Sequence, residues 1–213
     1  MNKNNYSYVG IAFVILVFGI WVINEYASRT EVKSLVTFEK VPDFSFTNQH
    51  GRTITNEDFK GKVHVVEFFF TDCPTICPVM TQNTVLLQLK FNGNPHFAVA
   101  SISINPEKDT PEVLKVYAKE KGATMDNWHF LTGDGTAIFD FSNNGFKLYA
   151  GANEAAPGGF EHSGLFALVD KDGYIRSRTV RFGDHENPIK FYDGLDKKAI
   201  EMLKEDIQIL LDL

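Results

Sequence analysis

An apolar run that ends at two cysteines constrains the fold of this 213-residue chain more than any other feature. Residues 63–70, VHVVEFFF, are mostly β-branched and aromatic, which is typical of a strand buried on both faces of a sheet. Cys73 and Cys77, the only two cysteines of the chain, follow at once, and residues 79–90 then have a helical pattern. The thiols are therefore expected in a strand-to-helix turn, where partly positive backbone N–H groups favour thiolate over thiol.

The spacing of the cysteines favours a reactive or metal-binding pair. Three residues separate them, so in a regular helix their Cα atoms would lie about 6.2 Å apart, near the upper limit for a disulfide, whereas a metal ion bridges a wider gap. Proline follows each cysteine, and the helix is expected to start either at Pro78, with Cys77 as its cap, or at Pro74 with a kink. The alternative is a pair of buried structural thiols, which the prolines and the expected exposed turn position disfavour.

The N-terminal segment has the composition of a membrane anchor. No charged residue lies between Lys3 and Glu25, and residues 9–23 are apolar throughout, close to the ~20 residues that cross a bilayer. Tyrosine and tryptophan side chains lie near both ends, as interfacial aromatics do. A cleaved signal peptide is the alternative, but no small-x-small cleavage site is evident.

These patterns divide the chain into three parts. We expect residues 1–26 to be a single-pass transmembrane helix in the inner (cytoplasmic) membrane, residues 27–40 a polar tether, and residues 41–213 a folded domain on the periplasmic or extracytoplasmic side. The net charge is −6 and no basic cluster is present, so nucleic acid is not expected as a partner.

The order of elements in the domain predicts an α/β, thioredoxin-like fold, with a central mixed sheet flanked by helices. Residues 97–104 read as a second buried strand, so strand, helix and strand form a right-handed parallel crossover. Residues 165–170 and 174–180 form a hairpin, and residues 195–213 form a closing helix. Further expectations are a hairpin turn at His50 and Gly51, a helix capped by Asp109, a helix over 136–143, a strand over 145–149 and a loop over 181–188.

His162 is a candidate third ligand beside the two cysteines. His162 lies just before the strand at 165–170, where thioredoxin-like enzymes carry a cis-proline opposite their cysteines. A lone histidine is more often a surface or supporting group, so the residues alone leave both readings open. His64 is expected to pack inside the domain and Met80 in the core, while Asp72 either tunes the first cysteine or is solvated. Surface positions are expected for His50, His96, His129 and His185.

Several segments together resemble the Sco/SenC family. They are residues 69–78 (FFTDCPTICP), 103–111 (SINPEKDTP), 128–133 (WHFLTG), and 161–163 (EHS) before 165–173. In that family two cysteines and this histidine bind one copper ion, so the resemblance implies Cys73, Cys77 and His162 as ligands of Cu(I) or Cu(II). It also implies a partner, the copper-site subunit of cytochrome c oxidase or another copper or thiol protein. Asn105 departs from the usual aspartate of the family, which would alter a surface for partner contact without removing a ligand.

Coordination chemistry agrees with a copper-transfer protein. Soft thiolates select Cu(I), an added imidazole can also hold Cu(II), and three ligands leave a position open for a receiving protein. A second hypothesis is a thiol–disulfide oxidoreductase in which Cys73 and Cys77 are catalytic and form a disulfide, although such enzymes usually have two intervening residues. A third, a peroxidase, lacks the upstream proline and threonine at the required spacing. We therefore expect a metallochaperone rather than a turnover enzyme.

Overall fold

The computed structural model describes residues 10–21, 35–183 and 185–213. The chain forms two compact units, Met1–Ser34 and Leu35–Leu213. Residues 10–21 of the first unit form a helix. Among the described residues, no helix combines the length and the apolar character that crossing a membrane requires. The rest of the predicted anchor and most of the predicted tether lie outside the described residues.

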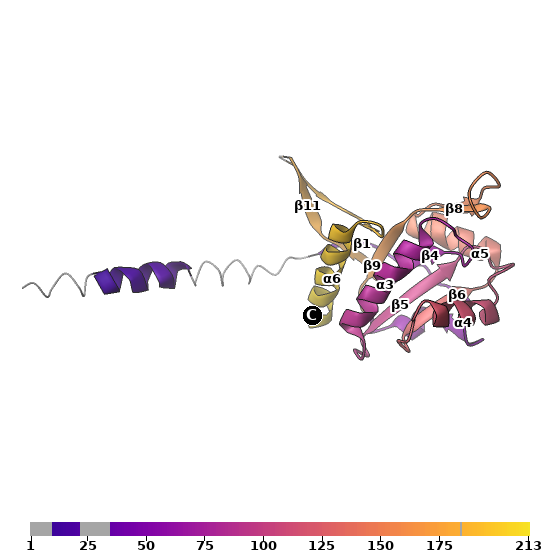
Figure 1. Ribbon diagram of the computed structural model, residues 1–213, viewed down its shortest axis with the longest axis horizontal. Helices are drawn as coiled ribbons and strands as arrows, with labels where there is room; N and C mark the ends of the chain where they lie inside the picture. Colours follow the sequence, from indigo (N-terminus) through magenta and orange to yellow (C-terminus); the bar gives the residue numbers. More distant parts are fainter. Residues whose placement is uncertain (1–9, 22–34, 184) are drawn as a thin grey trace, which may run out of the picture. The chain divides into compact units, whose positions relative to one another are not determined.

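The second unit is built on a mixed β-sheet, seen in Figure 1. Its order is β1 (Val36–Lys40), β10 (Tyr174–Ser177), β9 (Leu165–Val169), β4 (Val63–Phe69), β5 (Phe97–Ser103), β6 (Trp128–Thr132), β2 (Ser45–Asn48) and β3 (Thr53–Thr55), with β13 (Tyr192–Asp193) also paired to β9. The central strands β4, β5 and β6 are parallel, whereas β9 and β2 flank them in antiparallel orientation. The predicted parallel crossover and the antiparallel hairpin after it are confirmed.

Helices cover both faces of the sheet. They are α2 (Asn56–Phe59), α3 (Cys77–Phe91), α4 (Pro111–Glu120), α5 (Gly135–Asp140), the π-helix η1 (Phe141–Phe146) and α6 (Lys197–Asp212). Adjacent residues of β4 point to opposite faces of the sheet, so their contacts show which helix covers each face. The ring of Phe69 packs 5.4 Å from that of Tyr117 on α4, while the ring of Phe68 packs 5.9 Å from that of Phe146 on η1.

The strand that leads to the cysteines lies at the centre of the core. Every residue of β4 and of β5 is buried, as the unbroken apolar run predicts. Their pairing runs from Val63 opposite Phe97 to Phe69 opposite Ser103, so the carboxyl ends of both strands meet at one edge of the sheet. The segments after β4 and β5 are therefore neighbours in space.

Three local expectations differ from the structure. Residues 36–40 belong to β1 rather than to the tether, because β1 pairs with β10. Residues 145–149 are not a strand, since the Asn143 side chain bonds both backbone groups of Ala150 and closes this segment into a turn. Residues 181–188 are not a loop: β11 (Thr179–Phe182) and β12 (His185–Pro188) form a hairpin, with Gly183 at a φ of 61° in its turn.

Candidate metal centre

The two cysteines lie on either side of the start of α3. Cys77 is the first residue of the helix, Ile76 is its N-cap, and Pro78 lies in the first turn, where its missing N–H is not needed. Cys73 precedes the helix, in a turn closed by its own N–H donating to the carbonyl of Phe70 at 3.3 Å. Of the two helix starts that the prolines allowed, the structure is close to the one at Pro78.

His162 reaches the cysteines from a separate two-stranded sheet. It is the last residue of β8 (Phe160–His162), which pairs with β7 (Ala150–Ala152) so that His162 lies opposite Ala150. The ring of Phe70, at the end of β4, packs edge-on against the imidazole with centroids 6.1 Å apart. An aromatic side chain three residues before the first cysteine thus packs against the imidazole.

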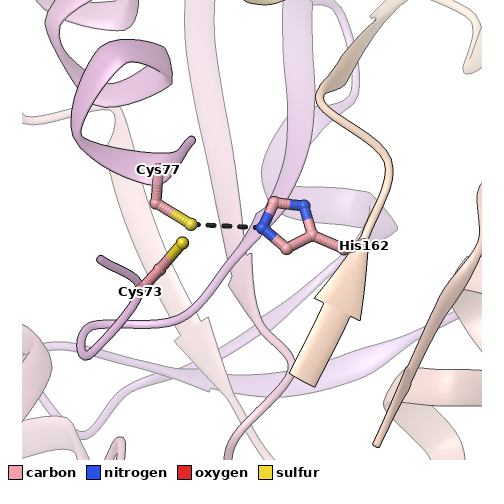
Figure 2. A group of neighbouring side chains, drawn as sticks. All are labelled: Cys73, Cys77 and His162. Carbon is pink, nitrogen blue, oxygen red and sulfur yellow. Dashed lines mark hydrogen bonds between the residues drawn. The ribbon is translucent and has the colours of Figure 1, made fainter. Parts of the chain in front are cut away.

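The two sulfurs and the imidazole form one compact group. The ligand atoms of Cys73, Cys77 and His162 all lie within 4.8 Å of one another. Figure 2 shows both thiols turned toward the imidazole, with Cys77 Sγ 3.1 Å from Nε2. The other ring nitrogen, Nδ1, lies 2.9 Å from the carbonyl oxygen of Ser163, which can only accept a hydrogen bond. Nδ1 therefore carries a proton, and Nε2 is the ring nitrogen that faces the sulfurs, the arrangement found in metal-binding histidines.

A cleft gives access to this group. It has a volume of ≈ 320 Å³, and its lining includes Cys73 and His162 but not Cys77. Cys73 is 8% exposed and Cys77 only 1%, so the exposed turn position expected for these thiols is wrong. The outer cysteine and the histidine meet an incoming ion or partner first, and Cys77 lies beneath them.

The two thiols differ in how strongly they hold a proton. The hydrogen bond donated by the Cys77 thiol lowers the pKa of Cys73 to about 3, against desolvation by burial. The same bond, together with burial, raises the pKa of Cys77 far above its usual value. At neutral pH Cys73 is therefore a thiolate. Cys77 keeps its proton until a metal ion or another group that binds its sulfur displaces that proton.

Asp109 anchors the turn that carries Cys73, a role that the sequence did not indicate. Its buried carboxylate accepts hydrogen bonds from the backbone N–H of Thr71 at 3.1 Å, from the Thr71 hydroxyl and from the Ser103 hydroxyl. The expected role as N-cap of α4 belongs instead to Thr110, whose side chain accepts from Val113. The only indication in the sequence was that Asp109 lies within residues 103–111, one of the segments that resemble the Sco/SenC family.

The other residues singled out lie away from the sulfurs or have structural roles. Met80 is fully buried, and His64 is buried with its ring 4.5 Å from that of Phe59, as predicted. His50, His96 and His185 are exposed, also as predicted. His129 is buried at 6% exposure, so its predicted surface position is wrong. Asp72 is solvated beside Lys108. Asn105 is 4% exposed, so it does not form part of an exposed contact surface.

The group has the donor set that copper prefers. Two sulfurs and one neutral imidazole suit Cu(I), and the imidazole allows Cu(II) as well. Among the residues that the structure describes, this is the one cluster of at least three histidine, cysteine or acidic side chains close enough to hold a metal. The group could therefore bind copper.

Fold and site together define the class of protein. The domain is thioredoxin-like, and a histidine approaches its cysteine pair where thioredoxin-type enzymes carry proline, so it is a metal-binding thiol protein of that fold. The SCO1/SenC family model matches residues 33–198, and the chain belongs to the SCO1/SenC family.

Individual relatives agree with this assignment. The SCO1 protein homolog of Bacillus subtilis is 32% identical over 180 residues, which cover 84% of this chain and 86% of that protein. BsSco, a member of the Sco family of cytochrome c oxidase assembly proteins, has a solved structure that matches with a TM-score of 0.69 at 31% identity, covering 85% of this chain and 98% of BsSco. Bradyrhizobium japonicum ScoI with copper bound shares the fold, with a TM-score of 0.59 at 22% identity and coverage of 81% and 99%.

Proposed function

We propose that this protein is a copper chaperone that holds one copper ion through Cys73, Cys77 and His162. The observation that carries the proposal is the position of Nε2 of His162, which faces two sulfurs in one group with all ligand atoms within 4.8 Å. Copper is the cargo: Cys73 offers a thiolate at the cleft, His162 offers its Nε2, and Cys77 offers a second sulfur once its proton has left. Three protein ligands leave a coordination position for a ligand of the recipient.

The recipient that we propose is the subunit of cytochrome c oxidase that carries the dinuclear copper site. BsSco belongs to a family of cytochrome c oxidase assembly proteins, and that description supports the same role here. We also propose that residues 1–26 anchor the chain in the cytoplasmic membrane, with the folded domain on the outer side. Alkaline extraction of membranes and protease treatment of intact cells test this topology: release by alkali, or full protection from protease, contradicts it.

Metal analysis of the domain that starts at Leu35 tests the ligand set. After loading with Cu(II) and desalting, we expect one copper per chain, and its loss in His162→Ala because a two-sulfur site without the imidazole holds Cu(II) poorly. His50→Ala is the matched control, because it removes an exposed histidine in a turn that is distant from His162 in the sequence. This variant should keep the full copper content. Equal copper in the wild type and in His162→Ala contradicts the proposal.

A second function is favoured by the asymmetry of the thiols. An outer thiolate at Cys73 and a buried thiol at Cys77 are the arrangement of an attacking and a resolving cysteine, so the pair could cycle between dithiol and disulfide and reduce the cysteines of a partner. Reduction of insulin or of the recipient's cysteines distinguishes the two roles. A dithiol reductase keeps this activity after His162→Ala, whereas a chaperone that only transfers copper has none.

A further inference from the structure

A buried imidazole lines a pocket at the edge of the sheet opposite the metal centre. His129 is the second residue of β6, is 6% exposed and lines a pocket of ≈ 450 Å³. Strand β6 begins near the level at which β4 begins, since Trp128 lies opposite Val99 and Val99 opposite Val65. Cys73 follows the other end of β4, and this pocket shares no lining residue with the cleft at the cysteines.

Hydrogen bonds fix the orientation of the Asn48 side chain and, through it, the tautomer of His129. Oδ1 of Asn48 accepts from the backbone N–H groups of His50 and Arg52, both at 3.0 Å. Its NH₂ group is therefore the donor that lies 3.5 Å from Nδ1 of His129. Because Nδ1 accepts this bond, the neutral ring carries its hydrogen on Nε2.

This N–H of His129 has no acceptor among the described residues, and it is open to solvent. Glu67 on β4 shows the contrasting case, because its Oε2 also lacks a partner but is sealed in the core. Nε2 of His129 retains contact with solvent, while the ring packs perpendicular to that of Phe59 with centroids 5.7 Å apart. A buried donor normally has a partner, so a molecule in the pocket is expected to supply the acceptor.

Two cations gather in the same pocket around Asp58. Nη2 of Arg52 lies 3.1 Å from the carboxylate oxygen Oδ1 of Asp58, and Nζ of Lys62 donates to the backbone carbonyl of Asp58 at 2.7 Å. The second carboxylate oxygen of Asp58 accepts from the backbone N–H of Thr55 at 2.9 Å. Both oxygens of this carboxylate are thus occupied, while Arg52 and Lys62 keep further N–H groups for a ligand.

The other titratable side chains of the pocket come from the surrounding segments. Glu57 on α2 and Lys60, which follows this helix, form an exposed ion pair at 3.3 Å. His50, from the turn between β2 and β3, and Asp126, just before β6, are exposed. Asp126 is the one lining carboxylate without an ion pair among the described residues, and water screens its charge.

The charge around the imidazole determines which kind of acceptor the pocket suits. Burial, and after it the positive charges of Arg52 and Lys62, lower the pKa of His129 to about 4. The Asp58 carboxylate acts in the opposite direction and less strongly than either cation. The ring is therefore a neutral donor in positive surroundings, which favour an acceptor that carries negative charge.

We propose that this pocket binds a small oxyanion of the phosphate class through the N–H of His129, the ammonium of Lys62 and the guanidinium of Arg52. Arginine and lysine are the usual partners of phosphate, and hydrogen bonds between charged groups are the strong ones. The buried N–H adds a donor whose direction is fixed by Asn48, which exposed lysines and arginines lack. The pocket volume of ≈ 450 Å³ leaves room for the organic part of a phosphate monoester.

Titration of inorganic phosphate into the full chain near neutral pH tests the proposal. Nitrogen NMR of isotope-labelled histidine side chains should show a saturable shift of Nε2 of His129, with a Kd of about 1 mM or tighter. Potassium chloride at the same ionic strength should give no saturable shift, because screening alone does not fill the pocket. The absence of a saturable shift with phosphate, or the same shift with chloride, overturns the proposal.

Variants of the two cations show whether phosphate binds in this pocket. Arg52→Gln and Lys62→Gln should each weaken phosphate binding about tenfold or more, since each removes a charge-assisted hydrogen bond. Arg181→Gln is the matched control: Arg181 is exposed and pairs with Glu186 at 2.9 Å, as Arg52 pairs with Asp58, but it lies on β11. It should bind phosphate as the wild type does. Equal affinity in all three variants means an adventitious ion only and overturns the proposal.

Glycerol phosphate, titrated in the same way, distinguishes the two sources of the phosphate group. Tighter binding of this ester than of inorganic phosphate would identify a phosphorylated small molecule as the occupant. Tighter binding of inorganic phosphate would identify the free ion. Neither result depends on copper, because the metal centre lies at the other edge of the sheet.

Discussion

Cys73 and Cys77 have different roles because the hydrogen bond between them leaves the charge on Cys73 and the proton on Cys77, and because Cys77 is more deeply buried. Cys73 is a thiolate on the wall of the cleft, and Cys77 is a thiol beneath it that also contacts Nε2 of His162. An ion or a partner disulfide meets Cys73 first, and the second sulfur completes the exchange. The order of events is thus set by burial.

Asp109 should control the position of Cys73. In Asp109→Asn one acceptor oxygen is replaced by an NH₂ group that cannot accept from Thr71, so we expect a loss of about 1–3 kcal/mol in the free energy of unfolding. We also expect faster alkylation of Cys73 in the folded protein, because its turn is less well held. Chemical denaturation and mass spectrometry of iodoacetamide-treated protein measure both.

Asp72→Asn is the matched control for Asp109. Asp72 lies next to Cys73, but its side chain is 62% exposed and pairs with an exposed Lys108 at 3.5 Å. Its substitution should cost less than about 1 kcal/mol. If the two variants have the same effect, the turn is not held by Asp109.

The loop before β8 covers the cleft through one close contact. Gly158 has a φ of 86°, and a Cβ at this position would lie 2.6 Å from Cε2 of Phe70. Gly158→Ala should therefore push the loop from Phe70, widen the cleft and increase the alkylation rate of Cys73. Gly159→Ala carries a similar φ of 83° but meets no atom within 4 Å, so it controls for backbone strain alone. Equal rates in both variants would show that the contact with Phe70 does not limit access.

Helix α6 is attached to the sheet by a buried ion pair. Asp206 is fully buried and accepts two hydrogen bonds from Arg178, at 2.7 Å and 2.8 Å, and one from the hydroxyl of Tyr192 at 2.5 Å. Asp206→Ala removes the buried carboxylate, so that Glu205, which is exposed, is the carboxylate left beside Arg178, and it should lower the free energy of unfolding by about 3–5 kcal/mol. Glu205→Ala removes a 60% exposed partner of the same arginine and should cost about 0–1 kcal/mol. Denaturant titration of both variants decides whether the buried pair is what holds α6.

The stability of the whole domain should fall in mild acid. Burial lowers the pKa of His64 and of His129 to about 4, whereas an unfolded histidine has a pKa near 6.5. The unfolded state binds more protons between these values, so the contribution is complete above about pH 6.5 and is lost as pH falls toward about 4, at up to about 3 kcal/mol per histidine. Denaturant titrations across this range should show it, and His64→Gln should remove about half; an unchanged profile contradicts the prediction.

Glu67 acts on stability with the opposite sign. Its folded pKa, about 7, lies above the usual value, so its contribution is complete below about pH 4.5 and is lost as pH rises through about 7. Glu67→Gln should therefore gain stability relative to the wild type above about pH 7, in the reduced, metal-free domain. A loss of stability at that pH would mean that the carboxylate is well solvated.

Patterns that are local in the chain were sufficient for much of this protein. The apolar run at 63–70 predicts a central buried strand because alternation disappears when both faces are covered. The prolines predict a helix that begins at the cysteines, and the alternation of elements predicts the mixed sheet. These inferences succeed because each depends on backbone geometry and on a burial pattern that residues close together in the sequence determine.

The contacts that make the centre work depended on tertiary structure. His162 reaches the sulfurs because β8 pairs with β7, a two-stranded sheet whose strands are short and carry no clear pattern. His129 is buried, Asp109 turns back toward Thr71, and Glu67 is left half-bonded, all through residues distant in the chain. A sequence shows which groups are present, but the depth, partners and charge of each group are set by the segments that fold against it.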